Sequence, residues 1–120
     1  MAKVLVVDDS RFARTMLRGM LYKFGHDVVG EAENAVQAME SYKSLRPELI
    51  TLDLVLPGES GLEILKNIRQ DDTQVKVVVV TASGQDKVDA QVMELGATAI
   101  LHKPFTVEEF EKVLKGALTH

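Results

Sequence analysis

The chain has 120 residues, of which 46% are hydrophobic and 27% are charged. A chain of this length fits one domain that buries roughly two-thirds of its unfolded surface, and the composition excludes a disordered or fibrous protein. The formal net charge of −4 disfavours non-specific binding to nucleic acid or anionic lipid, since both need clustered Lys and Arg. We therefore expect one domain over residues 1–120, with protein partners and no direct nucleic-acid contact.

The uninterrupted hydrophobic runs are short. The longest, Val4–Val7 and Val77–Val80, are far below the roughly 20 residues that a membrane-spanning helix needs. The segment Met1-Ala2-Lys3 lacks the succession of basic, apolar and small residues of a secretion signal, and the chain has no cysteine for disulfides. We expect a cytoplasmic protein without membrane insertion.

Strand-like and helix-like segments alternate along the chain. We predict strands at Lys3–Val7, Asp27–Ala32, Leu49–Leu52, Lys76–Thr81 and Ala99–His102. The intervening segments have the apolar period of amphipathic helices, as in Phe12, Met16, Leu17, Met20 and Leu21. We expect Ser10 and Thr106 to cap the first and last helices, and Gly25 and Gly96 to follow the first and fourth.

Strict alternation of strands and helices predicts a parallel sheet whose right-handed crossovers place helices on both faces. Strands covered on both faces are continuously apolar, so Val4–Val7, Leu49–Leu52 and Val77–Val80 are predicted to be central. Asp27–Ala32 and Ala99–His102 carry polar residues and are predicted edges. The fold class is therefore α/β, a doubly wound five-stranded sheet of flavodoxin-like order 2-1-3-4-5.

Reactive side chains stand at the ends of the predicted strands. Asp8 and Asp9 follow the first, Asp53 follows the third, and Thr81 and Lys103 mark the ends of the fourth and fifth. Parallel strands end at the same rim, where ligands of such folds bind, so these side chains should converge. The sequence predicts a pocket of three carboxylates, one hydroxyl and one ammonium group.

This combination suits phosphoryl chemistry. Three clustered carboxylates repel unless a cation sits among them, and Mg²⁺ accepts two or three carboxylates together with phosphate oxygens. A carboxylate can also be a nucleophile that forms an aspartyl phosphate. We assign that role to Asp53, with Lys103 neutralising the phosphoryl oxygens and Thr81 donating a hydrogen bond to them.

Four motifs carry a resemblance to a known family: Val6-Val7-Asp8-Asp9-Ser10, Asp53-Leu54-Val55-Leu56-Pro57 with Gly61, Val80-Thr81-Ala82, and Lys103-Pro104-Phe105. In this order at strand ends, they resemble the receiver domain of two-component response regulators, most closely the single-domain CheY-like type. The resemblance covers essentially the whole chain.

The resemblance implies that a phosphohistidine of a sensor histidine kinase phosphorylates Asp53. It implies that Asp8, Asp9, Asp53 and the backbone carbonyl of Val55 bind Mg²⁺. It further implies that Thr81 moves toward the phosphoryl group, and that the surface of the fourth helix, fifth strand and fifth helix then binds a target protein, as in chemotaxis. The expected protein is a monomeric switch, with dimerisation on phosphorylation left open, and not an enzyme beyond its own phosphorylation and dephosphorylation. The bond between Lys103 and Pro104 is often cis in this family.

Two features depart from the chemotaxis pattern. Ile100 holds the switch position in the fifth strand where the family often has Tyr or Phe, so coupling from Thr81 should run through packing. Val55 and Ser83 lack the amide and the acid that steer an attacking water in fast-cycling members. We therefore expect slow self-dephosphorylation.

Other interpretations stay open at this stage. Asp8 and Asp9 could serve only as a helix cap and Asp53 as a turn residue. The chain could be a receiver module of a longer regulator or hybrid kinase, an Asp-dependent phosphatase, or a flavin-binding carrier. The phosphatase lacks its Asp-x-Asp motif after the first strand, and the flavin protein lacks a phosphate-binding loop there. The histidines His26, His102 and His120 have no metal-ligand spacing and are expected at the surface.

Overall fold

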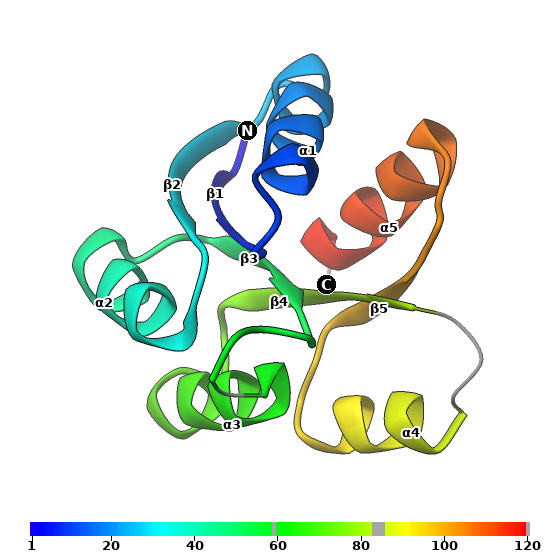
Figure 1. Ribbon diagram of the computed structural model, residues 1–120. Helices are drawn as coiled ribbons and strands as arrows, with labels where there is room; N and C mark the ends of the chain where they lie inside the picture. The colour runs from blue at the N-terminus through cyan, green and yellow to red at the C-terminus, as the bar shows by residue number, and fades with distance from the viewer. Residues whose placement is uncertain (59, 83–85, 120) are drawn as a thin grey trace.

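The computed structural model describes residues 1–58, 60–82 and 86–119, and it contains five strands and five helices (Figure 1). In chain order these are β1 Lys3–Val7, α1 Arg11–Lys23, β2 Asp27–Ala32, α2 Ala35–Leu45, β3 Leu49–Asp53, α3 Gly61–Asp71, β4 Lys76–Ala82, α4 Asp86–Glu94, β5 Ala99–Lys103 and α5 Val107–Leu118. Within the described residues, no helix is long and apolar enough to cross a membrane.

The strands form one parallel sheet in the order β2-β1-β3-β4-β5, so the predicted order and both predicted edge strands are confirmed. Three strands are one residue longer than predicted, because their ladders continue through Asp53, which pairs with Val80, and through Ala82, which pairs with Lys103. Asp53 and Lys103 are therefore the last residues of strands. Their backbones are held by the sheet.

Helices cover both faces of the sheet, as predicted. Figure 1 shows α1 and α5 on one face and α2, α3 and α4 on the other. Successive residues of a strand point to opposite faces, so β4 contributes Val78 and Val80 to the core under α1 and α5, and Val77 and Val79 to the core under the other three helices. The central strands β1, β3 and β4 are buried on both sides, which explains their continuous apolar sequences.

The predicted helix ends are confirmed. Ser10 caps α1 by accepting a hydrogen bond from the amide of Ala13 at 3.2 Å. Thr106 and Glu109 form a reciprocal capping box at the start of α5. Gly25 and Gly96 follow α1 and α4 with φ of 85° and 101°, a backbone region that side-chain-bearing residues rarely adopt.

The sheet buries one hydroxyl without a partner. Thr51 lies in β3 between Val6 and Val78 of the neighbouring strands, and its Oγ1 has no hydrogen-bond partner among the residues described. Thr98 provides a contrast, because its Oγ1 accepts a hydrogen bond from the amide of Val77 at 3.0 Å.

We predict that Thr51→Val stabilises the protein by about 1 kcal/mol, because a methyl group of similar shape replaces an unsatisfied buried hydroxyl. Thr98→Val is the matched control and should destabilise by about 1 to 2 kcal/mol, because the Val77 amide loses its acceptor. Urea unfolding followed by circular dichroism measures both. A loss of stability in Thr51→Val equal to that in Thr98→Val would contradict the prediction.

Candidate functional site

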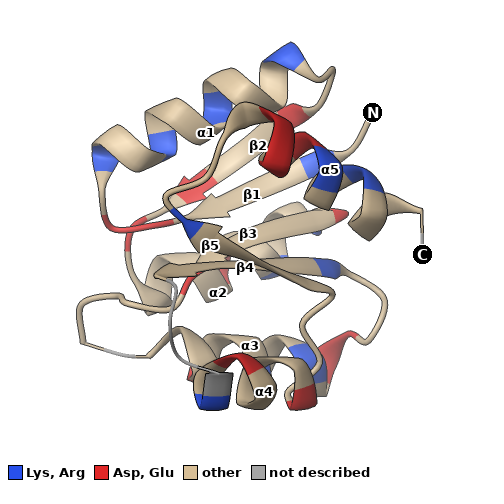
Figure 2. Ribbon diagram, turned by 90° about the vertical axis from the view of Figure 1, so that its right-hand side faces the viewer, with Lys and Arg blue, Asp and Glu red and all other residues tan. Residues whose placement is uncertain are grey.

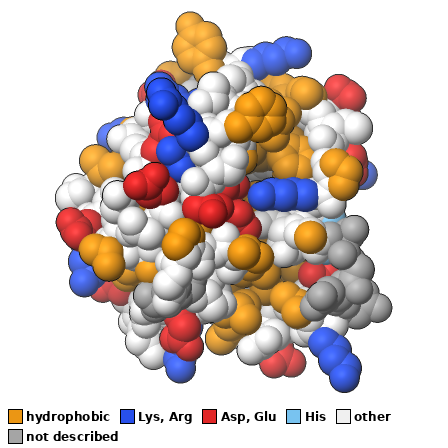
Figure 3. Space-filling model, in the orientation of Figure 1, with side chains coloured by type: hydrophobic (Ala, Val, Ile, Leu, Met, Phe, Trp, Pro, Cys, Tyr) orange, Lys and Arg blue, Asp and Glu red, His pale blue; other side chains and the backbone are white. Residues whose placement is uncertain are grey.

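The predicted pocket exists at the carboxyl rim of the sheet. Figure 3 shows acidic side chains gathered near the middle of this face, with a basic side chain beside them and hydrophobic side chains around. Asp8, Asp9 and Asp53 each offer one carboxylate oxygen, and these oxygens lie within 4.8 Å of one another. Asp8 and Asp53 are buried, at 1% and 7% exposure, whereas Asp9 is exposed. The predicted convergence of the three carboxylates is confirmed.

A lysine from the far end of the chain completes the cluster. The Nζ of Lys103 lies 3.4 Å from Oδ2 of Asp8 and 3.5 Å from Oδ2 of Asp53. These distances are longer than those of a tight charge-assisted hydrogen bond, so the ammonium group is shared between two carboxylates. The peptide bond between Lys103 and Pro104 is cis, as the family resemblance implied.

Backbone amides orient the two buried carboxylates. The amide of Ser10 donates to Oδ1 of Asp8 at 2.8 Å, and the amide of Val55 donates to Oδ1 of Asp53 at 3.1 Å. In both residues Oδ2 is then the oxygen that faces Lys103. One oxygen of each carboxylate thus accepts a hydrogen bond from the backbone, and the other faces the Lys103 ammonium group.

Asp53 is held in an environment that disfavours its charge. Burial raises the pKa of the Asp53 carboxyl above its ordinary value of 3.8, and the negative charge of Asp8 adds to this rise. The Val55 amide and the Lys103 ammonium group act in the opposite direction, but they do not cancel the effect of burial. An ionised, partly desolvated carboxylate of this kind is suited to bind a cation or to attack an electrophile.

The loop after β3 is tightly packed behind Asp53. The amide of Gly61 donates to the carbonyl oxygen of Leu54 at 2.9 Å. A Cβ atom at position 61 would lie 2.6 Å from the carbonyl oxygen of Asp53 and 2.6 Å from the Cα of Leu54. Only glycine allows this approach, so Gly61 fixes the start of α3 against the end of β3.

The oxygen ligands fit a hard divalent cation. Octahedral Mg²⁺ has metal–oxygen distances of about 2.1 Å, so its ligand oxygens are about 3 to 4 Å apart. The 4.8 Å spread of the three carboxylates is close to this span, and small movements or one bridging water would adapt it. The amide of Val55 lies beside Asp53. That the Val55 carbonyl is a further ligand stays a prediction.

The predicted switch residues lie on the two strands that follow Asp53 in the sheet, Thr81 on β4 and Ile100 on β5. Thr81 is 9% exposed and lies near the end of β4, next to Val80, the partner of Asp53 in the ladder. Ile100 packs partly buried against the core beneath α2, α3 and α4. Ser83 lies outside the described residues, as does His120.

Two polar pairs near the rim were not predicted from the sequence. Nε2 of His102 lies 2.7 Å from Oδ2 of Asp89 and links β5 to α4. Arg14 in α1 binds Glu31 in β2. His102 is only partly exposed, like His26, whose Nδ1 accepts a hydrogen bond from the amide of Ala2. Glu31 and His102 interrupt apolar edge strands, which was the available signal, but a polar residue in an edge strand usually faces solvent.

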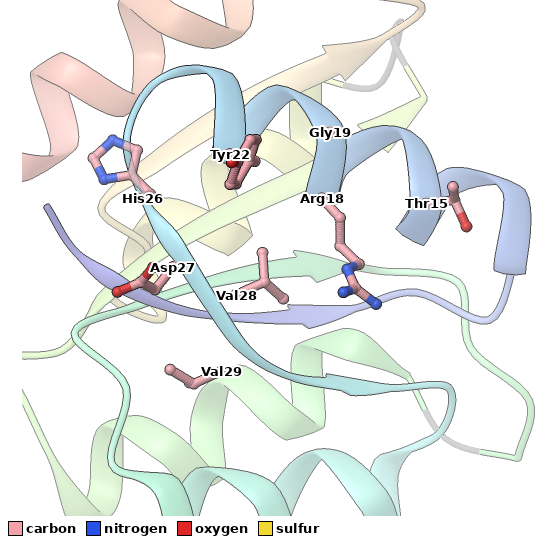
Figure 4. Close-up of a pocket in the computed structure, with 8 residues that line it drawn as sticks. All are labelled: Thr15, Arg18, Gly19, Tyr22, His26, Asp27, Val28 and Val29. Atoms are coloured by element: carbon pink, nitrogen blue, oxygen red, sulfur yellow. The ribbon is translucent and has the colours of Figure 1, made fainter.

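A separate hollow lies away from this chemistry. It has a volume of about 650 Å³ and runs between α1 and β2, with Arg18, Tyr22 and His26 in its lining (Figure 4). It contains none of the residues of the acidic cluster.

Comparison with known proteins assigns this arrangement to a family. The family model of the response regulator receiver domain matches residues 4–115. The chain belongs to this family. It is 36% identical to chemotaxis protein CheY of Bacillus subtilis, with 97% of each chain covered, and 38% identical to chemotaxis protein CheY of Thermotoga maritima, with 94% and 98% covered.

Solved structures agree with the family assignment. The response regulator domain of Thermotoga maritima CheB superposes with a TM-score of 0.86 at 28% identity, covering 98% of this chain and 96% of that one. The chain is thus a CheY-like receiver domain of a two-component response regulator, with the flavodoxin-like fold of that family.

We predict that Asp53→Asn raises the thermal midpoint at pH 7 in the presence of EDTA, because the folded state no longer holds a partly desolvated charge. The pKa of Asp53 is higher in the folded state than in the unfolded state. The wild type therefore loses stability relative to the variant as the pH rises from the ordinary carboxyl pKa to the raised pKa of the folded state. The gain should vanish below about pH 3, where the carboxyl is neutral in both the folded and the unfolded state.

Thermal unfolding across this pH range tests the prediction, with Asp27→Asn at an exposed position as the control. Mg²⁺ should narrow the gap, because it binds the folded wild type. An equal gain at low and neutral pH would show that ionisation of Asp53 is not the cause.

Proposed function

We propose that the protein is a phosphorylation-activated switch in which Asp53 accepts a phosphoryl group from a sensor histidine kinase. The observation that carries this proposal is the position of Asp53: its carboxylate is buried at a strand end, oriented by the Val55 amide, and within 3.5 Å of the Lys103 ammonium group and 4.8 Å of two further carboxylates. Phosphoryl transfer depends mainly on such positioning and charge neutralisation.

The transfer step conserves the phosphoryl group. An oxygen of Asp53 attacks the phosphorus of a phosphohistidine, the phosphorus–nitrogen bond breaks, and the imidazole leaves with the electron pair. Asp8 and Asp9 would hold Mg²⁺ together with Asp53, and the bound ion would neutralise the phosphoryl oxygens. Lys103, already shared between Asp8 and Asp53, is placed to pair with one of those oxygens.

Phosphorylation replaces a carboxylate by a dianion and so changes the local charge by about one unit. In the proposed switch the Thr81 hydroxyl turns toward the new phosphoryl oxygens. Couplings of about 1 to 3 kcal/mol are typical of such transitions and change a two-state equilibrium about five- to 150-fold. The surface of α4, β5 and α5 would then bind a target protein, with Ile100 transmitting the change by packing.

The pathway is also part of the proposal. The CheY relatives are named as chemotaxis proteins, which supports a chemotaxis target for this chain. A relative from Bacillus subtilis at 34% identity is named a sporulation initiation phosphotransferase, which supports phosphoryl transfer by a chain of similar length. We favour the chemotaxis target, acting in the cytoplasm as a monomer, without enzymatic turnover of other substrates.

The proposal predicts a gain of one phosphoryl group on incubation with acetyl phosphate and Mg²⁺. Intact mass spectrometry should show this gain in the wild type, and neither in EDTA nor in Asp53→Ala. The phosphoryl group should appear once per chain and phosphate release should be slow, limited by self-dephosphorylation, whereas a phosphatase would show rapid multiple turnover. No mass gain, even with a histidine kinase as donor, would overturn the proposal.

The environment of Val55 predicts a long-lived phosphoryl group. Val55 is 76% exposed beside Asp53, and its side chain offers no hydrogen bond to an attacking water. Val55→Asn should shorten the lifetime severalfold, because the added amide can orient that water. Val36→Asn, at an exposed position on α2, is the control. Release of phosphate after removal of the donor measures the lifetime, and equal lifetimes in Val55→Asn and wild type would contradict the prediction.

A further inference from the structure

Arg14 joins three elements at the rim of the site. Its side chain is only 12% exposed. Nη1 donates to the backbone carbonyl oxygen of Asp8 at 2.7 Å, and Nε donates to Oε1 of Glu31 at 3.0 Å. The guanidinium group therefore ties α1 both to the turn after β1 and to β2. Neither the helix cap nor the core explains a largely covered arginine at this place.

Two hydrogen bonds hold the backbone on either side of the Asp8 Cα, and the one from Arg14 orients the peptide plane between Asp8 and Asp9. The amide of Asp8 donates to the carbonyl oxygen of Ala32 at 3.0 Å, and the carbonyl of Asp8 accepts from Arg14. The same carbonyl belongs to the peptide group that joins Asp8 to Asp9. Because Asp9 is exposed, the direction of its carboxylate depends largely on this backbone.

Glu31 balances the charge of Arg14. A free guanidinium group beside three carboxylates would pair with them and compete with a metal ion. Glu31 accepts hydrogen bonds from Arg14 through Oε1 and from Arg18 through Oε2, at 3.0 and 2.6 Å. The carboxylate of Glu31 thus holds the Arg14 guanidinium group on the side of the Asp8 backbone.

We propose that Arg14 is a positioning residue for metal binding, which holds the peptide between Asp8 and Asp9 so that both carboxylates face the cation. Glu31 pairs with the Arg14 guanidinium group and so prevents it from pairing with those carboxylates. The inference rests on the proposed function, because it concerns the Mg²⁺ site of the phosphoryl acceptor. It adds two residues that lie outside the acidic cluster.

The chain contains a matched control for this role. Arg18 lies on the same helix, carries the same charge and binds the same Glu31. Its side chain is 58% exposed, however, and its hydrogen bond is to Glu31 and not to Asp8. Figure 2 shows basic positions spaced along α1, so a general effect of helix charge would involve both arginines. A positioning effect would involve Arg14 alone.

The experiment measures Mg²⁺ affinity by calorimetry in the unphosphorylated full chain. Arg14→Gln and Arg14→Lys should each weaken binding about tenfold, the lower end of the effect of residues that orient metal ligands. Arg14→Lys keeps the charge but cannot hold both partners in the same geometry. Arg18→Gln should stay within about twofold of the wild type if the contact to Asp8 is what matters. Thermal midpoints in EDTA show that each variant is folded.

A second measurement needs no metal. The amide chemical shifts of Asp9 and Ser10 report the orientation of the Asp8–Asp9 backbone, and they should change in Arg14→Gln but not in Arg18→Gln. Glu31→Gln should also weaken Mg²⁺ binding, and the double variant Arg14→Gln/Glu31→Gln should be no weaker than Arg14→Gln alone, because Glu31 acts through Arg14.

The outcomes separate the inference from the proposed function. Unchanged or tighter Mg²⁺ binding in Arg14→Gln, or equal losses in Arg14→Gln and Arg18→Gln, would overturn the role of Arg14 while leaving the phosphoryl acceptor intact. A wild type that binds no Mg²⁺ would overturn the proposed function as well. Additive losses in the double variant would overturn the part assigned to Glu31.

Discussion

Repulsion among three carboxylates gathered at the ends of two parallel strands is the constraint on which the rest of this structure depends. Burial of Asp8 and Asp53 makes their charges costly, and the raised pKa of Asp53 is the direct consequence. Neighbouring groups reduce this electrostatic cost. The Lys103 ammonium group lies between the two buried carboxylates, and backbone amides donate hydrogen bonds to one oxygen of each. Carboxylates whose charges destabilise one another in the absence of a metal ion are suited to bind a cation and then a phosphoryl group.

The sheet supplies the rigidity that such a site needs. Asp53 and Lys103 are the last residues of paired strands, so the positions of their Cα atoms follow from the ladder. Gly61 allows the following helix to start in contact with the backbone of Asp53. The turn that carries Asp8 and Asp9 lies beyond the end of β1, and the hydrogen bond from the Asp8 amide to Ala32 is its last link to β2. Arg14 acts at that turn, where the sheet no longer determines the backbone.

The route from the site toward α4 differs from an aromatic gate. Thr81 and His102 are partners in the ladder between β4 and β5, and residues paired in this way point to the same face of the sheet. On that face Ile100 packs against the core, and His102 is bonded to Asp89 of α4. In the proposed switch, a movement of Thr81 would therefore act on two neighbours on this face: the packing of Ile100 and the hydrogen bond from His102 to Asp89 of α4.

The sequence by itself determined the fold and the identity of the cluster, because apolar period and strand polarity report burial directly, and parallel strands must bring Asp8, Asp53 and Lys103 to one rim. Tertiary structure alone decided which oxygens face Lys103, the close approach at Gly61, and the pairs of Arg14 with Glu31 and of His102 with Asp89. These depend on side chains distant in sequence meeting at specific angles. Residue type and spacing carry no information about such angles, so the largely covered Arg14 and the exposed Arg18 on the same helix look alike until α1 is placed against β2.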